Sequence, residues 1–202
     1  MLSYRINRRG VLLPEPISIH ALRGKFSQHI ATVTDEKAKT AAVQILVLEN
    51  HGLEIVLTKR SAFVQNHKNE ISFPGGAAEK SDGNLYSTAL RETCEEINIC
   101  ENSIQFLGSL EPFTTHYGLM IYPFIGSIPV LELEQARPNR EVEAIFTIPL
   151  KWFMEKTNYE LRDIKVAGGT RHQVIFYKPY QNYVVWGITA SILQKFIYII
   201  TN

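Results

Sequence analysis

The spacing of apolar residues divides the first half of the chain into two strands and two helices. The apolar run Ala41–Leu48 predicts a buried strand, and Leu53–Thr58 predicts a second strand that a turn at residues 51–52 joins to it as a hairpin. Apolar residues three and four positions apart predict a helix over Ile17–Ile30 and another over Leu85–Ile97. A polar loop at residues 61–72 and a tight Pro-Gly-Gly turn at residues 73–76 separate the hairpin from the second helix.

The second half of the chain is mainly a series of β-type runs. The predicted elements are strands at Ile104–Leu110, Ile121–Ile128 and Ile145–Pro149, a hairpin over Ile164–Tyr177, a short helix near Trp152 and a final helix at Trp186–Ile200. Helices and strands do not alternate strictly, so we expect an α+β fold with a mixed β-sheet sandwiched between helices (α/β/α). No linker divides the chain, so we expect a single domain over residues 1–202, with residues 1–40 as a helical N-terminal extension and 41–202 as the core.

Charge and hydropathy exclude several classes of partner. A net charge of +1 on 202 residues gives no global field that would attract nucleic acid or a membrane surface, so we expect neither as a partner. The most apolar segment, Val184–Ile200, contains Gln194 and Lys195, and we expect it to be a buried helix rather than a membrane span.

The two cysteines bear on the compartment. Cys94 and Cys100 do not form a CxxC pair, and Cys94 falls inside the second predicted helix, so we expect no structural disulfide and a reducing, cytoplasmic environment. Residues 1–10 are basic but precede no apolar stretch, so we expect no secretory signal. The six histidines show no zinc-binding spacing.

The second predicted helix carries three carboxylates on nearly the same face. At 100° per residue, Glu92 and Glu96 point within about 40° of each other, and Glu95 lies about 60° to the other side. Like charges at these spacings cost a helix roughly 0.2–0.5 kcal/mol per pair, which a bound cation would reverse. Clustered carboxylate oxygens suit Mg²⁺, which keeps water and takes up substrate phosphate oxygens.

Short polar residues are expected to bound this helix. Ser81 and Asp82 precede it and are N-cap candidates, and Asn98 follows its last residue, where a left-handed conformation is common. Asn tolerates that conformation best after glycine. The Gly75-Gly76 turn would let the backbone approach a metal site that a side chain would obstruct.

The spacing of the acidic helix resembles the signature of the Nudix hydrolases, Gly-x5-Glu-x7-Arg-Glu-U-x-Glu-Glu-x-Gly-U, where U is bulky and apolar. The matching residues are Arg91, Glu92, Glu95, Glu96 and Ile99. Thr93 replaces an apolar residue and Asn98 replaces the glycine. The acidic residue before the helix is open between Glu79 and Asp82, because Asp82 follows Gly76 by six but precedes Arg91 with eight residues between them.

This resemblance implies a Nudix fold and hydrolysis of a nucleoside diphosphate linked to another group, with Mg²⁺ or Mn²⁺ as cofactor. The metal ligands that it implies are Glu92, Glu95 and Glu96, with the backbone of Gly76 beside them. Arg91 would orient a glutamate, and Glu95 and Glu96 would belong to the catalytic machinery. Metal ions and positioning dominate such phosphoryl transfer.

A second resemblance lies upstream and points to the coenzyme A diphosphatase branch. Its pattern, Leu-Leu-Thr-x-Arg-Ser/Ala-x3-Arg-x3-Gly-x3-Phe-Pro-Gly-Gly, matches at Leu57, Thr58, Arg60, Ser61 and residues 73–76, with Gln65 and Asn69 as departures. The residues expected to bind substrate are Lys59, Arg60, Ser61, Lys68, Gly75 and Gly76. Cations here suit the diphosphate and the separate 3′-phosphate of coenzyme A.

The downstream segments Glu141-Val142…Phe146…Pro149-Leu150 and 185–190 also resemble this branch, and Glu141 is the candidate for a general base on a loop. The substrate would be a small coenzyme A-like molecule, and the protein a monomer or homodimer. Tyr117 and Phe113 are candidates for stacking on adenine, and Trp152 and Trp186 are expected in the core. Two alternatives stay open: a Nudix diphosphatase for dinucleotides, nucleotide sugars or damaged nucleotides, and a non-catalytic nucleotide-binding module.

Overall fold

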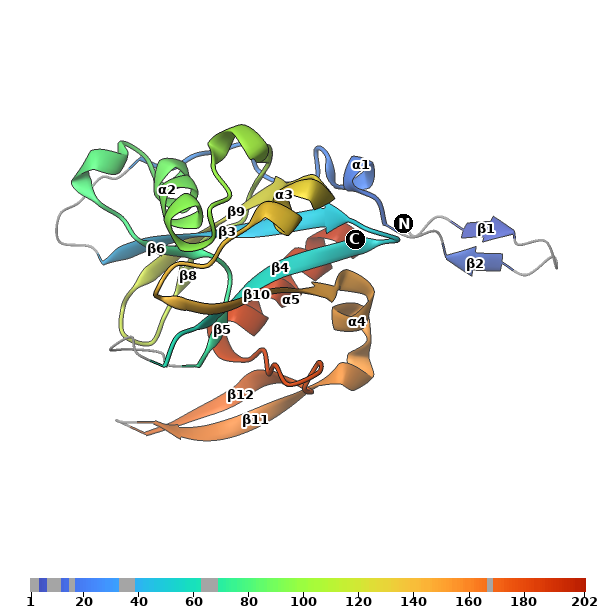
Figure 1. Ribbon diagram of the computed structural model, residues 1–202. Coiled ribbons are helices and arrows are strands. Elements are labelled where there is room, and N and C mark those ends of the chain that lie inside the picture. The colour runs from blue at the N-terminus through green and yellow to red at the C-terminus, as the bar shows by residue number, and fades with distance from the viewer. Residues whose placement is uncertain (1–3, 7–11, 15–16, 33–38, 63–68, 167–168) are drawn as a thin grey trace.

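The predicted apolar strands pair into one mixed sheet of eight strands (Figure 1). The structure is a computed structural model, and it describes residues 4–6, 12–14, 17–32, 39–62, 69–166 and 169–202. The strand order is β10-β4-β3-β9-β7, with β5 paired to β4, β6 to β3 and β8 to β9. Two further hairpins, β1-β2 and β11-β12, form separate two-stranded sheets.

The element bounds in chain order are as follows. The strands are β1 (Tyr4–Ile6), β2 (Leu12–Pro14), β3 (Thr40–Glu49), β4 (Leu53–Arg60), β5 (Ile71–Ser72), β6 (Gly75–Ala77), β7 (Gln105–Ser109), β8 (Phe113–Thr114), β9 (Met120–Ser127), β10 (Val142–Pro149), β11 (Tyr159–Val166) and β12 (Gly169–Tyr177). The α-helices are α1 (Ile19–Leu22), α2 (Leu85–Ile97), α3 (Val130–Gln135), α4 (Leu150–Met154) and α5 (Gly187–Thr201), and the 3₁₀ turns are η1 (Lys80–Asp82), η2 (Glu101–Ser103) and η3 (Lys156–Asn158).

Strand β3 lies at the centre of the sheet and determines where the sheet opens. Its side chains are buried on both faces, as expected for a strand read from a continuous apolar run. It runs parallel to β9, while β6 pairs with its first half (Ala41–Val43) and β4 with its last residues (Val47–Glu49). The sheet therefore splits on one side of β3, between β6 and β4.

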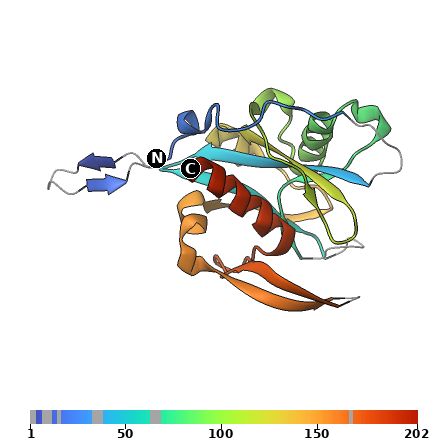
Figure 2. The same ribbon diagram turned by 180° about the vertical axis from the view of Figure 1, so that it is seen from behind.

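Helices cover both faces of the sheet, which confirms the predicted α/β/α arrangement (Figures 1 and 2). On one face, Leu85 and Ala89 of α2 pack in a buried cluster with Phe124 of β9. On the other face, Leu193 and Phe196 of α5 join the largest buried cluster of the protein. The apolar C-terminal segment is thus a core helix, as predicted.

The β11-β12 hairpin extends from the body on the face that α5 covers (Figures 1 and 2). Tyr177 at the end of β12 is buried against Phe153 and Trp152, and Phe176 stacks on Trp186 with 5.1 Å between ring centroids. The hairpin is longer than predicted, because β11 begins at Tyr159 rather than Ile164. The other end of the hairpin, where β11 leads into β12, lies on the same side of the molecule as β6 and the β8-β9 turn (Figures 1 and 2).

The helix predicted over Ile17–Ile30 is wrong beyond Leu22. Arg23 already leaves the helical conformation with a ψ of 133°, and Gly24 follows with a φ of +75°. The chain then runs extended and forms a bridge between Ser27 and Ser109 of β7. Leu22 and Phe26 are buried all the same, so their apolar spacing reflects packing along an extended segment rather than one helical face.

The bounds of the central elements also needed correction. Residues 73–76 do not form one tight turn, because Gly75 and Gly76 already belong to strand β6. The N-cap of α2 is Asn84, whose side chain accepts a hydrogen bond from the Ser87 N–H at 2.8 Å, and neither Ser81 nor Asp82 caps this helix. Asn98 ends the helix with φ 59° and ψ 28°, which confirms the predicted left-handed residue.

The two cysteines form a disulfide, contrary to the prediction. Their Cα atoms lie 4.4 Å apart. The cause is Asn98, whose left-handed backbone turns the chain back after the last turn of α2 and brings Cys100 beside Cys94. The bond therefore closes the C-terminal end of the acidic helix.

Candidate active site

The Gly-Gly strand and the acidic helix meet where the sheet splits. Helix α2 packs over β3 and β6, so its inner residues face the backbone of Gly75 and Gly76. A Cβ atom on Gly76 would lie 2.4–2.6 Å from the carboxylate atoms of Glu92, so this position accepts no side chain while Glu92 keeps its place. Gly75 has a φ of +149° and its missing Cβ would lie 2.3 Å from the carbonyl oxygen of Ala42.

Glu96 is the most deeply buried of the three glutamates on the acidic helix. Its residue is 5% exposed, and its Oε2 accepts a hydrogen bond from the Gly75 N–H at 3.1 Å. The pKa of Glu96 is raised to about 7, mainly by burial. The charges of Glu92 and Glu141 also raise it, while the Gly75 N–H and Arg60 lower it. Burial also raises the pKa of Glu92, although Arg91 opposes that shift.

Glu95 lies apart from this pair. Its side chain is 57% exposed and receives a hydrogen bond from Nη1 of Arg91 at 3.3 Å. The structure thus brings Glu92 and Glu96 together with Glu141, while Glu95 is held at the edge of the group.

The donor set fits a divalent cation, although it is not arranged as a finished cage. Within the described ranges, no group of three or more His, Cys, Asp or Glu side chains stands close enough to hold a metal ion as placed. The charge of Glu141 nevertheless raises the pKa of both Glu92 and Glu96, and a side chain on Gly76 would fill the space beside Glu92. Carboxylates that repel one another beside open backbone are the oxygen ligands that Mg²⁺ and Mn²⁺ take.

Arg91 is fixed by Asp82 rather than by Glu79. Its Nε donates to Oδ1 of Asp82 at 2.7 Å and its Nη2 to Oδ2 at 3.1 Å, whereas Glu79 lies 4.0 Å away. The guanidinium lowers the pKa of Asp82 to about 2. From this position Nη1 donates to Glu92 at 3.0 Å, so Arg91 holds a carboxylate of the site, as the resemblance implies.

Basic residues from the end of β4 face acidic residues from the start of β10. Arg60 approaches Glu96 at 3.5 Å with Nη1 and Glu141 at 3.4 Å with Nη2, and the Ser61 N–H donates to the Glu141 carbonyl oxygen at 2.7 Å. Lys59 forms an ion pair of 2.6 Å with Glu143. Of the residues expected to bind substrate, Lys68 lies outside the described residues.

Glu143 was not predicted from the sequence. It sits at a β-bulge between Val142 and Ala144, where the register with β4 shifts by one residue. Bulges redirect side chains near functional sites, and the alternation of apolar residues in β10 carries no signal for one.

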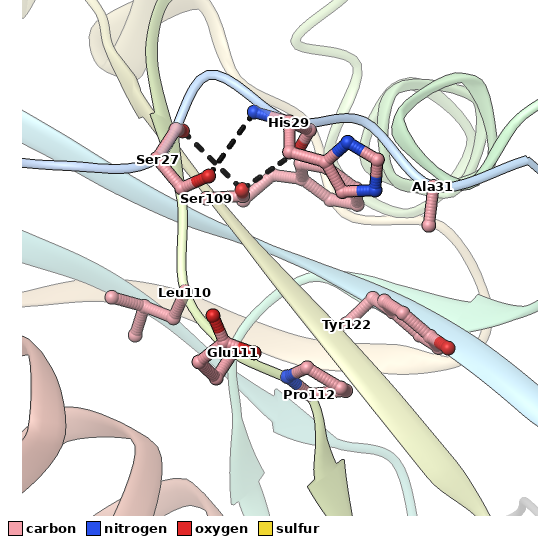
Figure 3. A pocket seen from close by; sticks show the side chains of 9 residues that line it. Ser27, His29, Ala31, Ser109, Leu110, Glu111, Pro112 and Tyr122 are labelled. Carbon is pink, nitrogen blue, oxygen red and sulfur yellow. Dashed lines mark hydrogen bonds between the residues drawn. The ribbon is translucent and has the colours of Figure 1, made fainter.

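A small pocket elsewhere contains none of the predicted site residues (Figure 3). Its volume is about 60 Å³, and its lining residues are Ser27, His29, Ala31, Ser109, Leu110, Glu111, Pro112, Tyr122 and Phe124. Ser109 donates hydrogen bonds to the carbonyl oxygens of His29 and Ser27, at 2.9 and 3.3 Å, and so anchors the N-terminal segment at β7 (Figure 3).

The mixed sheet between helices and the acidic helix beside the Gly-Gly strand fit a hydrolase that acts on phosphorus anhydrides, and comparison with known proteins supports this class. The model of the NUDIX domain matches residues 38–167. Uncharacterized Nudix hydrolase NudL from Photorhabdus laumondii is 35% identical over 155 residues, which cover 77% of this chain and 81% of that protein. The NudL protein of Yersinia pestis is 32% identical and covers 96% of this chain and 92% of its own length. The chain belongs to the Nudix family and is a Nudix hydrolase.

Solved structures agree at the level of the fold. An Ap4A hydrolase from C. elegans superimposes with a TM-score of 0.53 at 15% identity, covering 80% of this chain and 98% of that one. A MutT/nudix family protein from Listeria innocua superimposes with a TM-score of 0.51 at 18% identity and covers 83% and 96%. Among the described residues, no helix is both long and apolar enough to cross a membrane.

Proposed function

We propose that this Nudix hydrolase cleaves the diphosphate linkage of coenzyme A or its derivatives, giving 3′,5′-ADP and 4′-phosphopantetheine or its acyl form. Nudix hydrolases act on nucleoside diphosphate derivatives and generally use divalent metal ions, and we propose Mg²⁺ or Mn²⁺ here. The observation that carries the proposal is the position of Arg60. This residue belongs to the upstream segment that resembles the coenzyme A branch, and it reaches Glu96 and Glu141 at once.

The departure at Asn69 does not weaken this proposal. The branch pattern has glycine there, and Asn69 adopts a φ of +61°. Its N–H donates to the Arg60 carbonyl oxygen at 3.2 Å and so closes the loop that begins at Arg60. Asn is the residue that best replaces glycine in this conformation, so position 69 keeps the backbone that the glycine would give. The other departure, Gln65, lies outside the described residues.

The residues have distinct proposed roles. When bound, divalent ions would neutralise the charge that develops on the phosphoryl oxygens, with Glu92, Glu95 and Glu96 as ligands. Arg91 positions Glu92 through Asp82. Arg60 would release the carboxylates to metal and donate to the diphosphate, which a planar guanidinium binds with two parallel hydrogen bonds.

Glu141 is the proposed general base. Its side chain is 58% exposed, so water reaches it, and its charge raises the pKa of both Glu92 and Glu96. A positioned base contributes roughly 10²–10⁴-fold. We expect Glu141→Gln to lower kcat by at least about a hundredfold, with Glu134→Gln on α3 as the matched surface control; a loss below about tenfold would remove Glu141 from the mechanism.

The direct test is product analysis. The wild-type protein with Mg²⁺ or Mn²⁺ is incubated with coenzyme A, acetyl-coenzyme A, ADP-ribose and a diadenosine polyphosphate, and products are weighed by mass spectrometry in ¹⁸O-labelled water. We expect 3′,5′-ADP and phosphopantetheine, with the label on one of them identifying the attacked phosphorus. Intact coenzyme A beside a cleaved dinucleotide or nucleotide sugar would overturn the branch assignment.

A further inference from the structure

The outer end of the β11-β12 hairpin contacts the β8-β9 turn through a cation–π pair. The guanidinium of Arg171 in β12 lies over the ring of Tyr117, 5.6 Å from its centroid. The two residues come from segments more than fifty positions apart in sequence. Such a cation–π contact is attractive, and it leaves the rest of the guanidinium available to an anion.

Tyr117 is held in place although its ring faces solvent. It is 69% exposed, the highest value among the exposed large hydrophobic residues of the described part of the chain. The turn that carries it is closed by three hydrogen bonds: Thr115 N–H to the Leu119 carbonyl, Leu119 N–H to Thr115 Oγ1, and Gly118 N–H to the Thr115 carbonyl. A fixed, exposed aromatic ring is a platform on which a base can stack.

Arg171 has no carboxylate partner among the residues that the structure describes, and its Nε is buried without a hydrogen-bond partner. The facing strand does offer a carboxylate, Asp163, but both its oxygens are engaged. Oδ2 contacts Nδ1 of His172 at 2.8 Å, and Oδ1 accepts the Gln173 N–H at 3.0 Å.

A β-bulge directs Arg171 toward Tyr117. In the hairpin, Asp163 of β11 stands opposite two residues of β12, His172 and Gln173, and Gln173 takes a φ of +55°. Asp163 binds both of these residues and so fixes the bulge. Because a bulge bends and twists the strand beyond it, the direction of Arg171 is built into the hairpin.

Two of the other described cations near the site are already paired. Lys59 is bound by Glu143, and Arg60 by Glu96 and Glu141. These two suit the diphosphate, and an additional phosphate on the same ligand would need another cation. Arg171 lies at this end of the molecule over an aromatic ring, and no described carboxylate pairs with it.

Strand pairing relates the strand that follows Tyr117 to the Gly-Gly strand. Gly76 pairs with Ala42 and Ala42 with Tyr122, so β9 lies two strand spacings, about 10 Å, from the Gly-Gly strand. The β8-β9 turn, which carries Tyr117, projects from the start of β9 at the same end of the sheet as β6 (Figures 1 and 2). Thr189 of α5, the helix next to the hairpin, donates to the Ile71 carbonyl oxygen of β5, which adjoins Lys59.

We infer that Arg171 and Tyr117 form a subsite for a 3′-phosphorylated adenosine, in which the base stacks on Tyr117 and the 3′-phosphate binds Arg171. This inference rests on the proposed function, since it assigns the nucleotide end of coenzyme A. It predicts that the protein distinguishes coenzyme A from 3′-dephospho-coenzyme A through one arginine on a hairpin outside the Nudix helix.

The test compares two variants of the same hairpin. Arg171→Ala removes the cation, and Arg162→Ala is the matched control, because Arg162 also lies over an aromatic ring, Phe176, but pairs with Glu160. We expect Arg171→Ala to raise KM for coenzyme A about tenfold with kcat within about twofold, and to leave KM for 3′-dephospho-coenzyme A within about twofold. Arg162→Ala should change neither substrate's KM.

Binding measurements separate this inference from the proposed function. Isothermal titration with 3′,5′-ADP and with AMP needs no turnover, so it remains decisive if coenzyme A is not cleaved. We expect the wild type to prefer 3′,5′-ADP and Arg171→Ala to lose that preference, while Tyr117→Ala weakens both ligands equally and Tyr117→Phe weakens neither. An equal affinity of the wild type for the two nucleotides, or an equal loss for both in Arg171→Ala, would overturn the subsite.

Discussion

Among single residues, Arg91 explains how the acidic helix holds its like charges together. Its guanidinium contacts Asp82, Glu92 and Glu95, and the first two of these carboxylates raise the already high pKa of the arginine. The repulsion along the helix is thereby offset in the absence of metal. The same contacts leave Glu96 outside the arginine's reach, so the most buried acid depends on Arg60 and on the Gly75 backbone.

Asp82 should stabilise the protein in a pH-dependent way. Its pKa is about 2 in the folded state against an ordinary 3.8, so its contribution is fully present above pH 3.8 and is lost as the pH falls toward 2. The difference corresponds to about 2 kcal/mol. We expect Asp82→Asn to lower the free energy of unfolding by about that amount at pH 6, and the gap between the two proteins to close toward pH 2, as measured by urea unfolding.

Glu79→Gln is the control for this prediction. Glu79 lies 4.0 Å from Arg91 and its side chain is 62% exposed, so the change should cost less than about 0.5 kcal/mol at any pH. A gap between wild type and Asp82→Asn that stayed constant from pH 6 to pH 2 would show that the ion pair with Arg91 contributes nothing.

The role of Glu95 as a metal ligand stays a prediction, and it is sharply testable because one hydrogen bond from Arg91 is what holds its carboxylate. We expect Glu95→Gln to raise the Mn²⁺ concentration for half-maximal activity by at least about tenfold. Glu101→Gln, an exposed acid just beyond the same helix, should leave it unchanged. If the variant required no more Mn²⁺ than the wild type, Glu95 would not be a metal ligand and would only pair with Arg91.

At the scale of elements, two asparagines adopt the left-handed backbone conformation that is usual for glycine. Asn98 at the end of α2 and Asn69 before β5 both adopt φ near +60°, at positions where the related patterns have glycine. Their short polar side chains tolerate this conformation at little cost. Two apparent departures from the patterns therefore preserve the backbone that the patterns require.

Helix α2 and strand β3 could be predicted from the sequence because packing and apolar spacing agree in them. The helix at Ile17–Ile30 could not, because the burial of Leu22 and Phe26 depends on contacts with distant strands and on the break at Gly24. The disulfide was missed for a related reason. Its geometry follows from the reversal at Asn98, and the spacing of Cys94 and Cys100 does not show that reversal.

The disulfide should fasten the end of α2. Closing a loop with six residues of separation removes unfolded-state entropy worth about 2 kcal/mol in the chain-entropy model. We expect dithiothreitol to lower the Tm of the wild type and to leave a Cys94→Ser/Cys100→Ser double variant unchanged, as followed by thermal circular dichroism. An identical response of both proteins to the reductant would show that the bond does not stabilise the fold.

At the scale of the whole molecule, elements from both faces of the sheet meet at the split beside β3. Glu92 and Glu96 reach it from α2 on one face, and Arg60 reaches it from β4, whose neighbour β5 contacts α5 on the other face. Gly75 and Gly76 form one edge of this split and carry no side chains into it. Residues that are far apart in sequence therefore converge on the place where the sheet is interrupted.

Metal binding should consequently stabilise the whole domain, because a ligand that binds the folded state alone shifts the unfolding equilibrium. With Mn²⁺ at about 100 times its Kd the folded state gains about 2.7 kcal/mol, which for a chain of this size corresponds to a rise in Tm of about 5–10 °C that EDTA reverses. We expect Glu92→Gln/Glu96→Gln to abolish the rise and Glu101→Gln/Glu134→Gln to retain it. If both double variants kept the full shift, Mn²⁺ would be binding elsewhere, and the assignment of the metal to the split beside β3 would be wrong.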